Sequence, residues 1–526
     1  MGRLKNLPKG TSPKYTTPFH YYLFSISKPS SPPNSSSFKP SRNKPVINTI
    51  TTTNLITLLL FVLFLLSFLL SHPSIFISNT STSALQNTIS MVPRPPYALI
   101  SGNVNVSQQE MEFWRQPDGL GYKPCLQFSI GYRRASAKIA KERRRFLLVK
   151  VSGGLNQQRN QIVDAVVFAR ILGAALVLPL LKFNVIWQDN SEFSDIFDVD
   201  HFIRTLHSDI RIVSRVPPTH KIPRPSSTVH SSIPSNLSPL WIRSRFLKQL
   251  DEDGVLVLEG LESKLSKDLP LDLQKLRCKV AFHALKFSRQ ILELGKKLAE
   301  RAGNGGPYIA LHLRLEEDVW IRTGCSPGLG QPYDDLVAQH RTARPDLLTG
   351  KLNMTHHHRK LAGLCPLNTK TLTMVLRALG AQRDARVYWA GGKPLGGELA
   401  LKALKDEFPK LMSKYTLAVD GELEIYENRS SVLAALDYIV ALNSDVFVPS
   451  HGGTMGLAMQ GHRAYVGHRK SVRPNKRGFA AMEMEEAGFG EMVRRMHKGL
   501  MGEPELRTQK TGRDVIAFPV PECMCR

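Results

Sequence analysis

The sequence predicts an α/β protein in which two Rossmann-like domains, each with a parallel sheet, face a cleft. Two runs of alternating apolar strands and helices carry this prediction, one beginning at Phe146 and the other at Tyr308. Glycine turns join strands to the following helices in both runs. At 526 residues the chain is also too long for one ordinary domain.

The start of the chain predicts a membrane anchor. Residues 1–53 contain eight Lys or Arg and no acidic residue, and residues 55–70 are almost wholly apolar. With residues 75–77 the run reaches the length of about 20 residues that crosses a bilayer. A basic flank stays in the cytosol. We therefore expect a single-pass type II protein. A plastid transit peptide is the competing interpretation, but it does not explain the apolar run.

This topology places the rest of the chain in the lumen of the secretory pathway. Glycosylation triplets lie beyond the anchor at Asn79, Asn105, Asn236, Asn353 and Asn428. The six cysteines are an even set and predict disulfides, with fifteen possible pairings. The net charge of +26 alone would suit nucleic-acid binding. A domain in the lumen, however, does not come into contact with nucleic acid. We expect no nucleic-acid partner.

The first α/β run begins with a strand at 146–151, a polar glycine turn, a helix at 162–172 and a strand at 174–179. Residues 205–245, rich in Pro, Ser and basic side chains, predict an irregular insertion.

The second run continues from Tyr308 with further helices and strands. Helices are expected at 369–379, 397–408 and 432–442, and strands at 386–390, 445–450 and 464–468. The predicted divisions of the chain are a basic cytosolic tail (1–53), an anchor (54–77), a luminal stem (78–140), an N-terminal domain (141–300), a C-terminal nucleotide-sugar-binding domain (301–500) and a C-terminal tail (501–526).

A buried strand runs into charged residues at His312, Arg314, Glu316 and Asp318. Burying an unpaired guanidinium costs several kcal/mol, about 3 or more, so Arg314 needs an anionic partner. In open α/β folds, ligands bind beyond the carboxyl ends of the strands. A bound phosphate or a catalytic carboxylate is therefore expected, and a structural pair with Glu316 or Asp318 is the alternative.

Two glycine turns complete the predicted site. The first offers amides and carboxamides for a phosphate or sugar hydroxyls, and the second offers hydroxyl donors and a backbone that a ligand can approach. Their candidate residues are Gly153, Gly154, Asn156 and Gln157 in the first, and Ser450, His451, Gly453 and Thr454 in the second. Three such sites in two α/β halves favour a nucleotide-diphosphate ligand.

Metal-binding patterns are weak. The Asp198-Val-Asp200 triplet has no buried strand before it, and residues 356–358 (three histidines) read as a solvated loop. Cys523-Met-Cys525 lacks a second ligand pair of zinc-like spacing. We expect no metal ligand.

The chain resembles the plant-type protein O-fucosyltransferase family of glycosyltransferases from about Phe113 to its C-terminus. The matching segments are 113–122, 152–161, 276–280, 283–285, 312–318, 363–366, 435–439, 444–449 and 461–463. The resemblance implies a GT-B fold, a Golgi type II enzyme, a nucleotide-sugar donor such as GDP-fucose, and metal-independent inverting transfer without a cofactor. It also implies that Arg314 binds the donor diphosphate and that the loop from Gly153 lines the site with Asn156 or Gln157.

The expected reaction is hexosyl or deoxyhexosyl transfer to a hydroxyl of a protein or cell-wall glycan. The leaving charge would be met by Arg314, Ser450 and Thr454, with Glu316 or Asp318 as general base or as braces for Arg314. Two turns depart from the family pattern, at residues 391–393 and 451–453. Rhamnosyl transfer in pectin synthesis and a non-catalytic luminal scaffold therefore stay open as alternatives.

Overall fold

The computed structural model describes residues 107–526 except 185, 223–228, 231–232, 346–347, 349–353, 481–487 and 507–513. The predicted anchor at 54–77 lies outside the described residues. Within the described ranges, no helix combines the length and the apolar composition that a membrane crossing requires.

The first half of the described chain is built on a parallel sheet around β2. Its order is β5-β3-β2-β7-β6, with β4 also paired to β2. Because the apolar run Phe146–Val151 is covered on both faces, nearly all of its side chains are buried. The strands are β2 (Phe146–Val151), β3 (Ala175–Val177), β4 (Leu180–Leu181), β5 (Ile212–Val213), β6 (Val229–His230) and β7 (Val255–Glu259).

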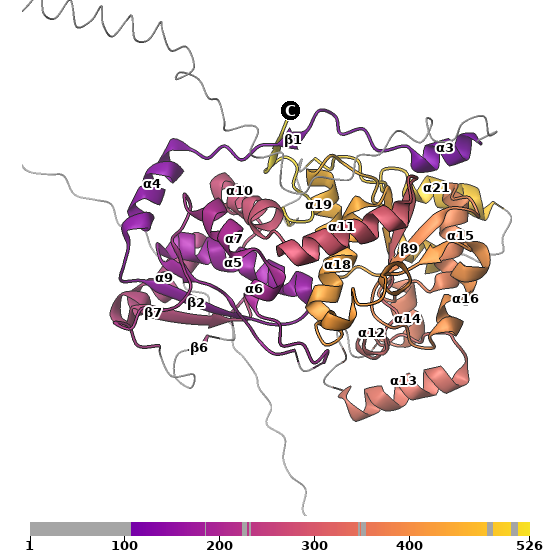
Figure 1. Ribbon diagram of the computed structural model, residues 1–526, viewed down its shortest axis with the longest axis horizontal. Coiled ribbons are helices and arrows are strands. Elements are labelled where there is room, and N and C mark those ends of the chain that lie inside the picture. The colour runs from indigo at the N-terminus through magenta and orange to yellow at the C-terminus, as the bar shows by residue number, and fades with distance from the viewer. Residues whose placement is uncertain are drawn as a thin grey trace, which may run out of the picture. The chain divides into compact units, whose positions relative to one another are not determined.

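Helices α5 and α9 pack against each other and against β2 and β7, on one face of this sheet (Figure 1). On the other face, a small cluster that includes Phe146, Leu148 and Val257 packs against Val213 and Val216. The long helix α5 begins after Gly154 and ends at Gly173, whose φ of 64° is the left-handed conformation that glycine adopts readily. The helices are α4 (Ile130–Lys141), α5 (Leu155–Leu172), α6 (Phe193–Ile196), α7 (Val199–Leu206), α9 (Pro239–Asp253), α10 (Leu271–Lys279) and the π-helical turn η1 (Val280–Ala284).

The second half has a parallel sheet of order β10-β9-β8-β11. Its strands are β8 (Tyr308–His312), β9 (Arg386–Ala390), β10 (Leu411–Met412) and β11 (Val446–Pro449). Its helices are α11 (Arg289–Gly303), α12 (Glu317–Thr323), α13 (Gln331–Ala343), α14 (His356–Leu361), α15 (Thr369–Leu379), α16 (Glu398–Glu407), α17 (Lys414–Leu417), the 3₁₀ turn η3 (Glu424–Tyr426), α18 (Ser430–Asn443), α19 (Thr454–Tyr465), α20 (Lys476–Ala480) and α21 (Phe489–His497).

These two sheets confirm the predicted α/β class and the parallel pairing. The predicted strand 386–390 and the predicted helix 369–379 have the observed bounds of β9 and α15. The insertion predicted as irregular supplies the short edge strands β5 and β6 and the start of α9.

The predicted strand at 464–468 is wrong. Helix α19 continues to Tyr465, and the chain then turns. The cause is Arg463, which is fully buried and donates to five carbonyl oxygens that surround the ends of α18 and α19. The acceptors are the carbonyls of Ala441, Leu442, Ser444, Asp445 and Lys470, at 2.8–3.1 Å.

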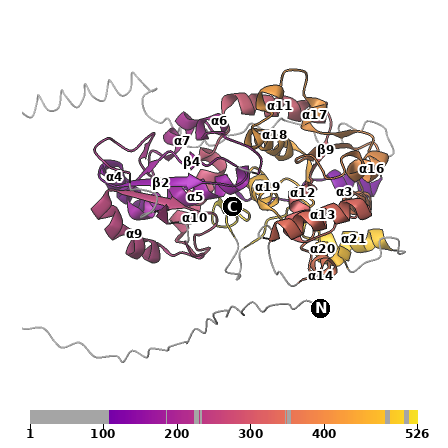
Figure 2. The same ribbon diagram turned by 90° about the horizontal axis from the view of Figure 1, so that it is seen from below.

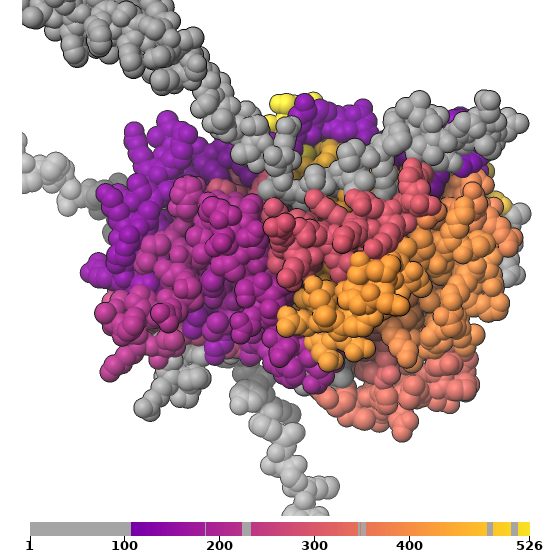
Figure 3. All heavy atoms as spheres, viewed as in Figure 1, coloured from indigo at the N-terminus to yellow at the C-terminus, as the bar shows by residue number. Residues whose placement is uncertain are grey.

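The C-terminal segment is joined covalently to the first half. Disulfides pair Cys278 with Cys523 and Cys125 with Cys525, while β12 (Met524–Cys525) pairs antiparallel with β1 (Lys123–Pro124). Figure 3 shows the yellow C-terminal residues at the surface beside indigo residues of this region. The third disulfide joins Cys325 to Cys365. Helix α3 (Gln108–Trp114) is the first element of the described residues. All six cysteines are thus paired, as the predicted disulfides require.

Helix α19 packs against this C-terminal segment at Gly461, which gives a test of the packing. A Cβ at Gly461 would lie 1.6 Å from the carbonyl oxygen of Ile516. Although Gly→Ala inside a helix normally stabilises by about 1 kcal/mol, we expect Gly461→Ala to destabilise by about 2 kcal/mol or more. Thermal unfolding followed by circular dichroism measures the shift.

The matched control is Gly131→Ala in α4, where the nearest atom to a new Cβ is 3.9 Å away. Its unfolding temperature should stay equal or rise. An unchanged unfolding temperature for Gly461→Ala would show that the segment 514–526 does not pack on α19 as described.

Candidate functional site

The carboxyl ends of three strands meet at one level of the second sheet. In the register of the sheet, His312 of β8 lies opposite Ala390 of β9 and Pro449 of β11. The chain winds outward from β8 to β9 and β10 on one side, and β11 lies on the other side. The order of strands therefore reverses between β8 and β11, and this is where ligands bind in open α/β sheets.

Ser450 joins the two strands at this reversal. Its amide donates to the carbonyl of His312, and its hydroxyl accepts a hydrogen bond from the amide of Arg314, both at 2.9 Å. Ser450 is fully buried. It therefore positions Arg314, and its predicted role as a hydrogen-bond donor to a ligand stays a prediction.

Side chains of β8 and of the residues just after it point alternately to the two faces of the second sheet. Leu313 and Leu315 pack in the core of the second half with Trp320. Tyr308 and Ala310, on the other face, belong to the core that includes the first half. Because successive side chains point to opposite faces, His312 and Arg314 lie on the face toward the first half.

The guanidinium of Arg314 has a weak carboxylate partner. Its Nε lies 3.6 Å from Oε2 of Glu316, whose Oε1 accepts a hydrogen bond of 2.9 Å from the amide of Gly392. In the described part of the chain, Arg314 makes no other ion pair. Glu316 thus connects Arg314 to the turn after β9, and the terminal nitrogens of Arg314 are available to an anion.

Asp318 lies apart from this pair. Its carboxylate is 3.5 Å from Nε of Arg322, one turn along α12. Of the two carboxylates left open as base or brace, the structure brings only Glu316 to Arg314. Both stay predictions as catalytic residues.

Two neutral histidines lie beside Arg314. Burial, with the nearby charge of Arg314, lowers the pKa of His312 to about 3. Burial, Lys476 and Arg314 lower the pKa of His451 to about 3 as well. Both rings are therefore uncharged near pH 7, and the local charge comes from Arg314 and Lys476.

The turn after β9 rests on a buried ion pair that sequence reasoning missed. Nζ of Lys414 lies 2.9 Å from Oδ2 of Asp437 and 2.7 Å from the carbonyl of Gly391. The same carboxylate accepts hydrogen bonds from the Tyr388 hydroxyl at 2.6 Å and the Gly391 amide at 3.0 Å. The available signal was Asp437 itself, since a carboxylate within an apolar helix needs partners.

The glycine turn before α19 is open to a ligand. Gly453 is the N-cap residue of α19 and has no side chain to cap the helix. Thr454, the first residue of the helix, is half-buried. A Cβ placed at Gly452 or Gly453 would meet no atom within 4 Å. The amides at the start of this helix are suited to an anion.

In the glycine turn of the first half, the side chain of Gln157 bonds back to the backbone of the turn. Gly153 has a φ of 86°. The side chain of Gln157 accepts from the Gly154 amide at 3.0 Å and donates to Glu262 at 3.2 Å. Burial raises the pKa of Glu262, which sequence reasoning did not select although it follows the end of β7. Gln157 is thus turned toward Glu262.

Asn156 connects this turn to the second half. It is 7% exposed, and its Nδ2 lies 3.3 Å from Sδ of Met455 in the first turn of α19. Its Oδ1 has no hydrogen-bond partner among the described residues. In Figure 2, α19 lies between α5 and α12, in keeping with this contact. Asn156, but not Gln157, therefore approaches the second glycine turn.

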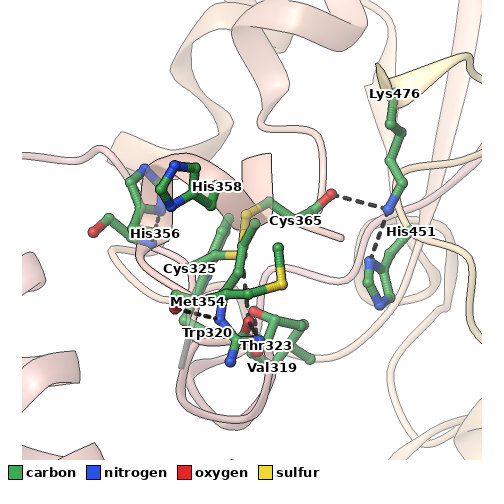
Figure 4. Close-up of a disulfide and its surroundings, with 12 residues drawn as sticks. Val319, Trp320, Thr323, Cys325, Met354, His356, His358, Cys365, His451 and Lys476 are labelled. Atoms are coloured by element: carbon green, nitrogen blue, oxygen red, sulfur yellow. Dashed lines mark hydrogen bonds between the residues drawn. A yellow bond between two sulfur atoms is a disulfide. The ribbon is translucent and has the colours of Figure 1, made fainter. Parts of the chain in front are cut away.

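The patterns set aside as metal sites have structural partners. Asp198 caps α7 by accepting from the amide of His201. Cys325, His356 and Cys365 lie close together, but the two sulfurs form a disulfide and Nδ1 of His356 accepts from the amide of Ser326 at 3.0 Å. The disulfide is drawn in Figure 4.

A separate pocket of about 370 Å³ lies between α15, α16 and the loop at 327–329. Leu315 and Trp320 line it, so it opens on the face of the sheet opposite Arg314. None of the twelve predicted site residues lines it. We assign it no role in the site at the strand ends.

Comparisons with known proteins agree with the resemblance seen in the sequence. A sequence model of the GDP-fucose protein O-fucosyltransferase family matches residues 146–466. O-fucosyltransferase 37 of Arabidopsis thaliana is 56% identical over 447 residues, which cover 84% of this chain and 79% of the relative. Rhamnogalacturonan I rhamnosyltransferase 1 of the same plant is 37% identical over 373 residues, covering 69% and 73%. The crystal structure of POFUT1 in complex with GDP aligns with a TM-score of 0.39 at 15% identity, over 63% of this chain and 99% of that one.

The buried neutral state of His312 predicts acid sensitivity. Its pKa of about 3 in the folded protein lies below the ordinary value of 6.5. The stability that it contributes is therefore complete above pH 6.5 and is lost as the pH falls toward 3, by about 2 kcal/mol at pH 5. We expect His312→Gln to lose less stability between pH 7 and pH 5 than the wild type in denaturant titrations.

His207→Gln, which changes an exposed ring, serves as the control. Its pH profile should match that of the wild type. If His312→Gln and the wild type show the same profile, His312 does not remain neutral on folding.

Proposed function

The chain belongs to the GDP-fucose protein O-fucosyltransferase family, and from that premise we propose that it transfers fucose from GDP-fucose to a hydroxyl of a protein or cell-wall glycan. The observation that carries this proposal is Arg314 at the strand reversal, with its terminal nitrogens free of other ion pairs among the described residues. The family predicted from the sequence is thereby confirmed.

The two halves would act as the two Rossmann-like domains of a GT-B arrangement. Residues 301–500 would hold the nucleotide-sugar, and residues 141–300 would present the loop from Gly153 to the acceptor. The contact between Asn156 and Met455 supports this proposal, because it brings the two glycine turns to one place.

In the proposed reaction, the acceptor oxygen attacks the anomeric carbon while the bond from that carbon to the diphosphate oxygen breaks. The configuration inverts, the proton of the acceptor hydroxyl passes to solvent water, and the diphosphate leaves with an additional negative charge. Arg314, Thr454 and the amides at the start of α19 would stabilise that charge without a metal. Donors of this kind contribute about 3 kcal/mol each to the transition state.

Rhamnosyl transfer is the second candidate. Two observations favour it: the similarity to a rhamnosyltransferase and the turns at Gly391–Lys393 and His451–Gly453. A panel of GDP- and UDP-sugars, tested for binding by calorimetry and for hydrolysis, distinguishes the donors. A folded protein that binds none of them would instead be the luminal scaffold.

We place the enzyme in the Golgi membrane as a single-pass type II protein with its catalytic domain in the lumen. The apolar run at 55–70 supports the anchor, and three disulfides suit an oxidising compartment. The glycosylation triplets at Asn236 and Asn428 have exposed asparagines. Asn79, Asn105 and Asn353 lie outside the described residues.

Glycosylation of the exposed asparagines tests the luminal location. We expect removal of N-glycans to increase the gel mobility of the full-length protein, and Asn236→Gln and Asn428→Gln each to remove one step of that shift. An untreated and a treated sample of equal mobility would argue against a luminal domain.

Mutation of Arg314 tests the chemistry. Because Arg314 would meet the charge of the leaving diphosphate, we expect Arg314→Ala to lower kcat/KM for the donor by about 100-fold or more. Arg322→Ala, on the neighbouring helix α12, is the matched control and should retain activity. Transfer near the wild-type rate by Arg314→Ala would refute the proposed mechanism.

The two nearby carboxylates refine the same test. Glu316→Gln should lose about tenfold, because Arg314 loses its charged brace, whereas Asp318→Asn should stay within about twofold of the wild type. A larger loss for Asp318→Asn would make Asp318 the acidic residue that matters.

A further inference from the structure

Lys476 makes a contact with the candidate site that the sequence did not reveal. It is the first residue of α20, and its Nζ lies 3.0 Å from the carbonyl oxygen of Cys365 and 3.3 Å from Nδ1 of His451 (Figure 4). Cys365 is held in turn by its disulfide with Cys325. The ammonium group is therefore anchored on one side and directed at His451 on the other.

This contact determines which nitrogen of His451 carries the proton. A lysine ammonium has donors and no acceptor, whereas a neutral imidazole has one donor and one acceptor nitrogen. Nδ1 must therefore accept the hydrogen bond from Lys476, and the ring proton lies on Nε2. Burial, together with the charges of Lys476 and Arg314, lowers the pKa of the His451 ring and keeps it neutral.

We propose that Lys476 is a positioning residue that holds His451 in the Nε2–H tautomer, so that this N–H donates to the diphosphate of the nucleotide donor. The inference rests on the proposed function, because it assumes that a diphosphate lies beside Arg314. The hydroxyl of Ser450 accepts a hydrogen bond from the amide of Arg314, and His451 follows Ser450 in the chain, so the side chains of Arg314 and His451 leave the backbone at neighbouring points. One anion can therefore meet the guanidinium and the imidazole N–H together.

The neighbouring residue of α20 offers a matched control. Arg477 is exposed, and its Nε donates to the carbonyl of Ala362 at 3.1 Å. Lys476 and Arg477 thus both bind carbonyls of the segment 362–365, but only Lys476 contacts His451. A loss shared by both variants would reflect that segment and not the histidine.

The experiment measures GDP affinity of the full-length protein by calorimetry. Since a hydrogen bond to a charged group contributes about 1.5 kcal/mol, we expect Lys476→Met to weaken GDP binding about tenfold. Lys476→Arg, which retains a cationic donor, should stay within about threefold, and Arg477→Met should bind as the wild type does.

Variants of His451 isolate the tautomer. His451→Gln places an amide N–H near the position of Nε2 and should keep most of the affinity, whereas His451→Asn, with its amide near Nδ1, should not. On the His451→Gln background, Lys476→Met should change the affinity by less than about twofold, because no tautomer remains to be selected.

Three results would overturn the inference alone, and the first two are wild-type affinity in Lys476→Met and the same tenfold loss on the His451→Gln background. Equal affinities of His451→Gln and His451→Asn would also overturn it, without any change at Lys476. A wild-type protein that binds no GDP would overturn the proposed function and this inference with it.

Discussion

Two hydrogen bonds of Ser450 hold the site together. They join β11 to the chain on either side of Leu313, at the point where the strand order reverses. If this connection were absent, Arg314 would follow the end of β8 with no fixed direction. Because Leu313 is buried in the opposite core, the backbone cannot rotate without exposing it. The two hydrogen bonds of Ser450 and the burial of Leu313 thus determine together where the guanidinium of Arg314 points.

Around the hydrogen bonds of Ser450, the charged side chains are arranged so that binding of an anion is favoured. Buried histidines are neutral because a second and third positive charge beside Arg314 would be costly in a poorly solvated place. The carboxylates nearby are occupied: Asp437 pairs with Lys414, and Glu316 bonds to Gly392. Lys476 contacts His451, which precedes the two glycines at the start of α19, and the amide of Arg314 bonds to the adjacent Ser450. A diphosphate has the size and charge that such a place accommodates.

Sequence patterns predicted local structure well where apolar periodicity was clear. The bounds of β9 and α15 agree, since each is a short apolar element that ends at a charged or glycine turn. The strand expected at 464–468 failed because its apolar residues end a helix whose course depends on Arg463 and the carbonyls around it. No window of sequence shows where a buried arginine finds its acceptors. Likewise, Glu316 and Asp318 are equivalent in sequence, and only the position of the β9 turn distinguishes them.

The sequence by itself determined the α/β class, the family and the buried strand that ends in His312 and Arg314. The class and the strand follow from alternation, glycine turns and the cost of burying an unpaired charge, all of which act over short distances along the chain. The family follows from the resemblance of whole segments, such as 113–122 and 152–161, to its members. The tertiary structure decided which residues support Arg314: Ser450 from 136 residues away and Glu316 through the turn after β9. It also decided the partners of Lys414 and Lys476. A side chain reaches such partners only after the sheets and helices have packed, so no local pattern could have selected them.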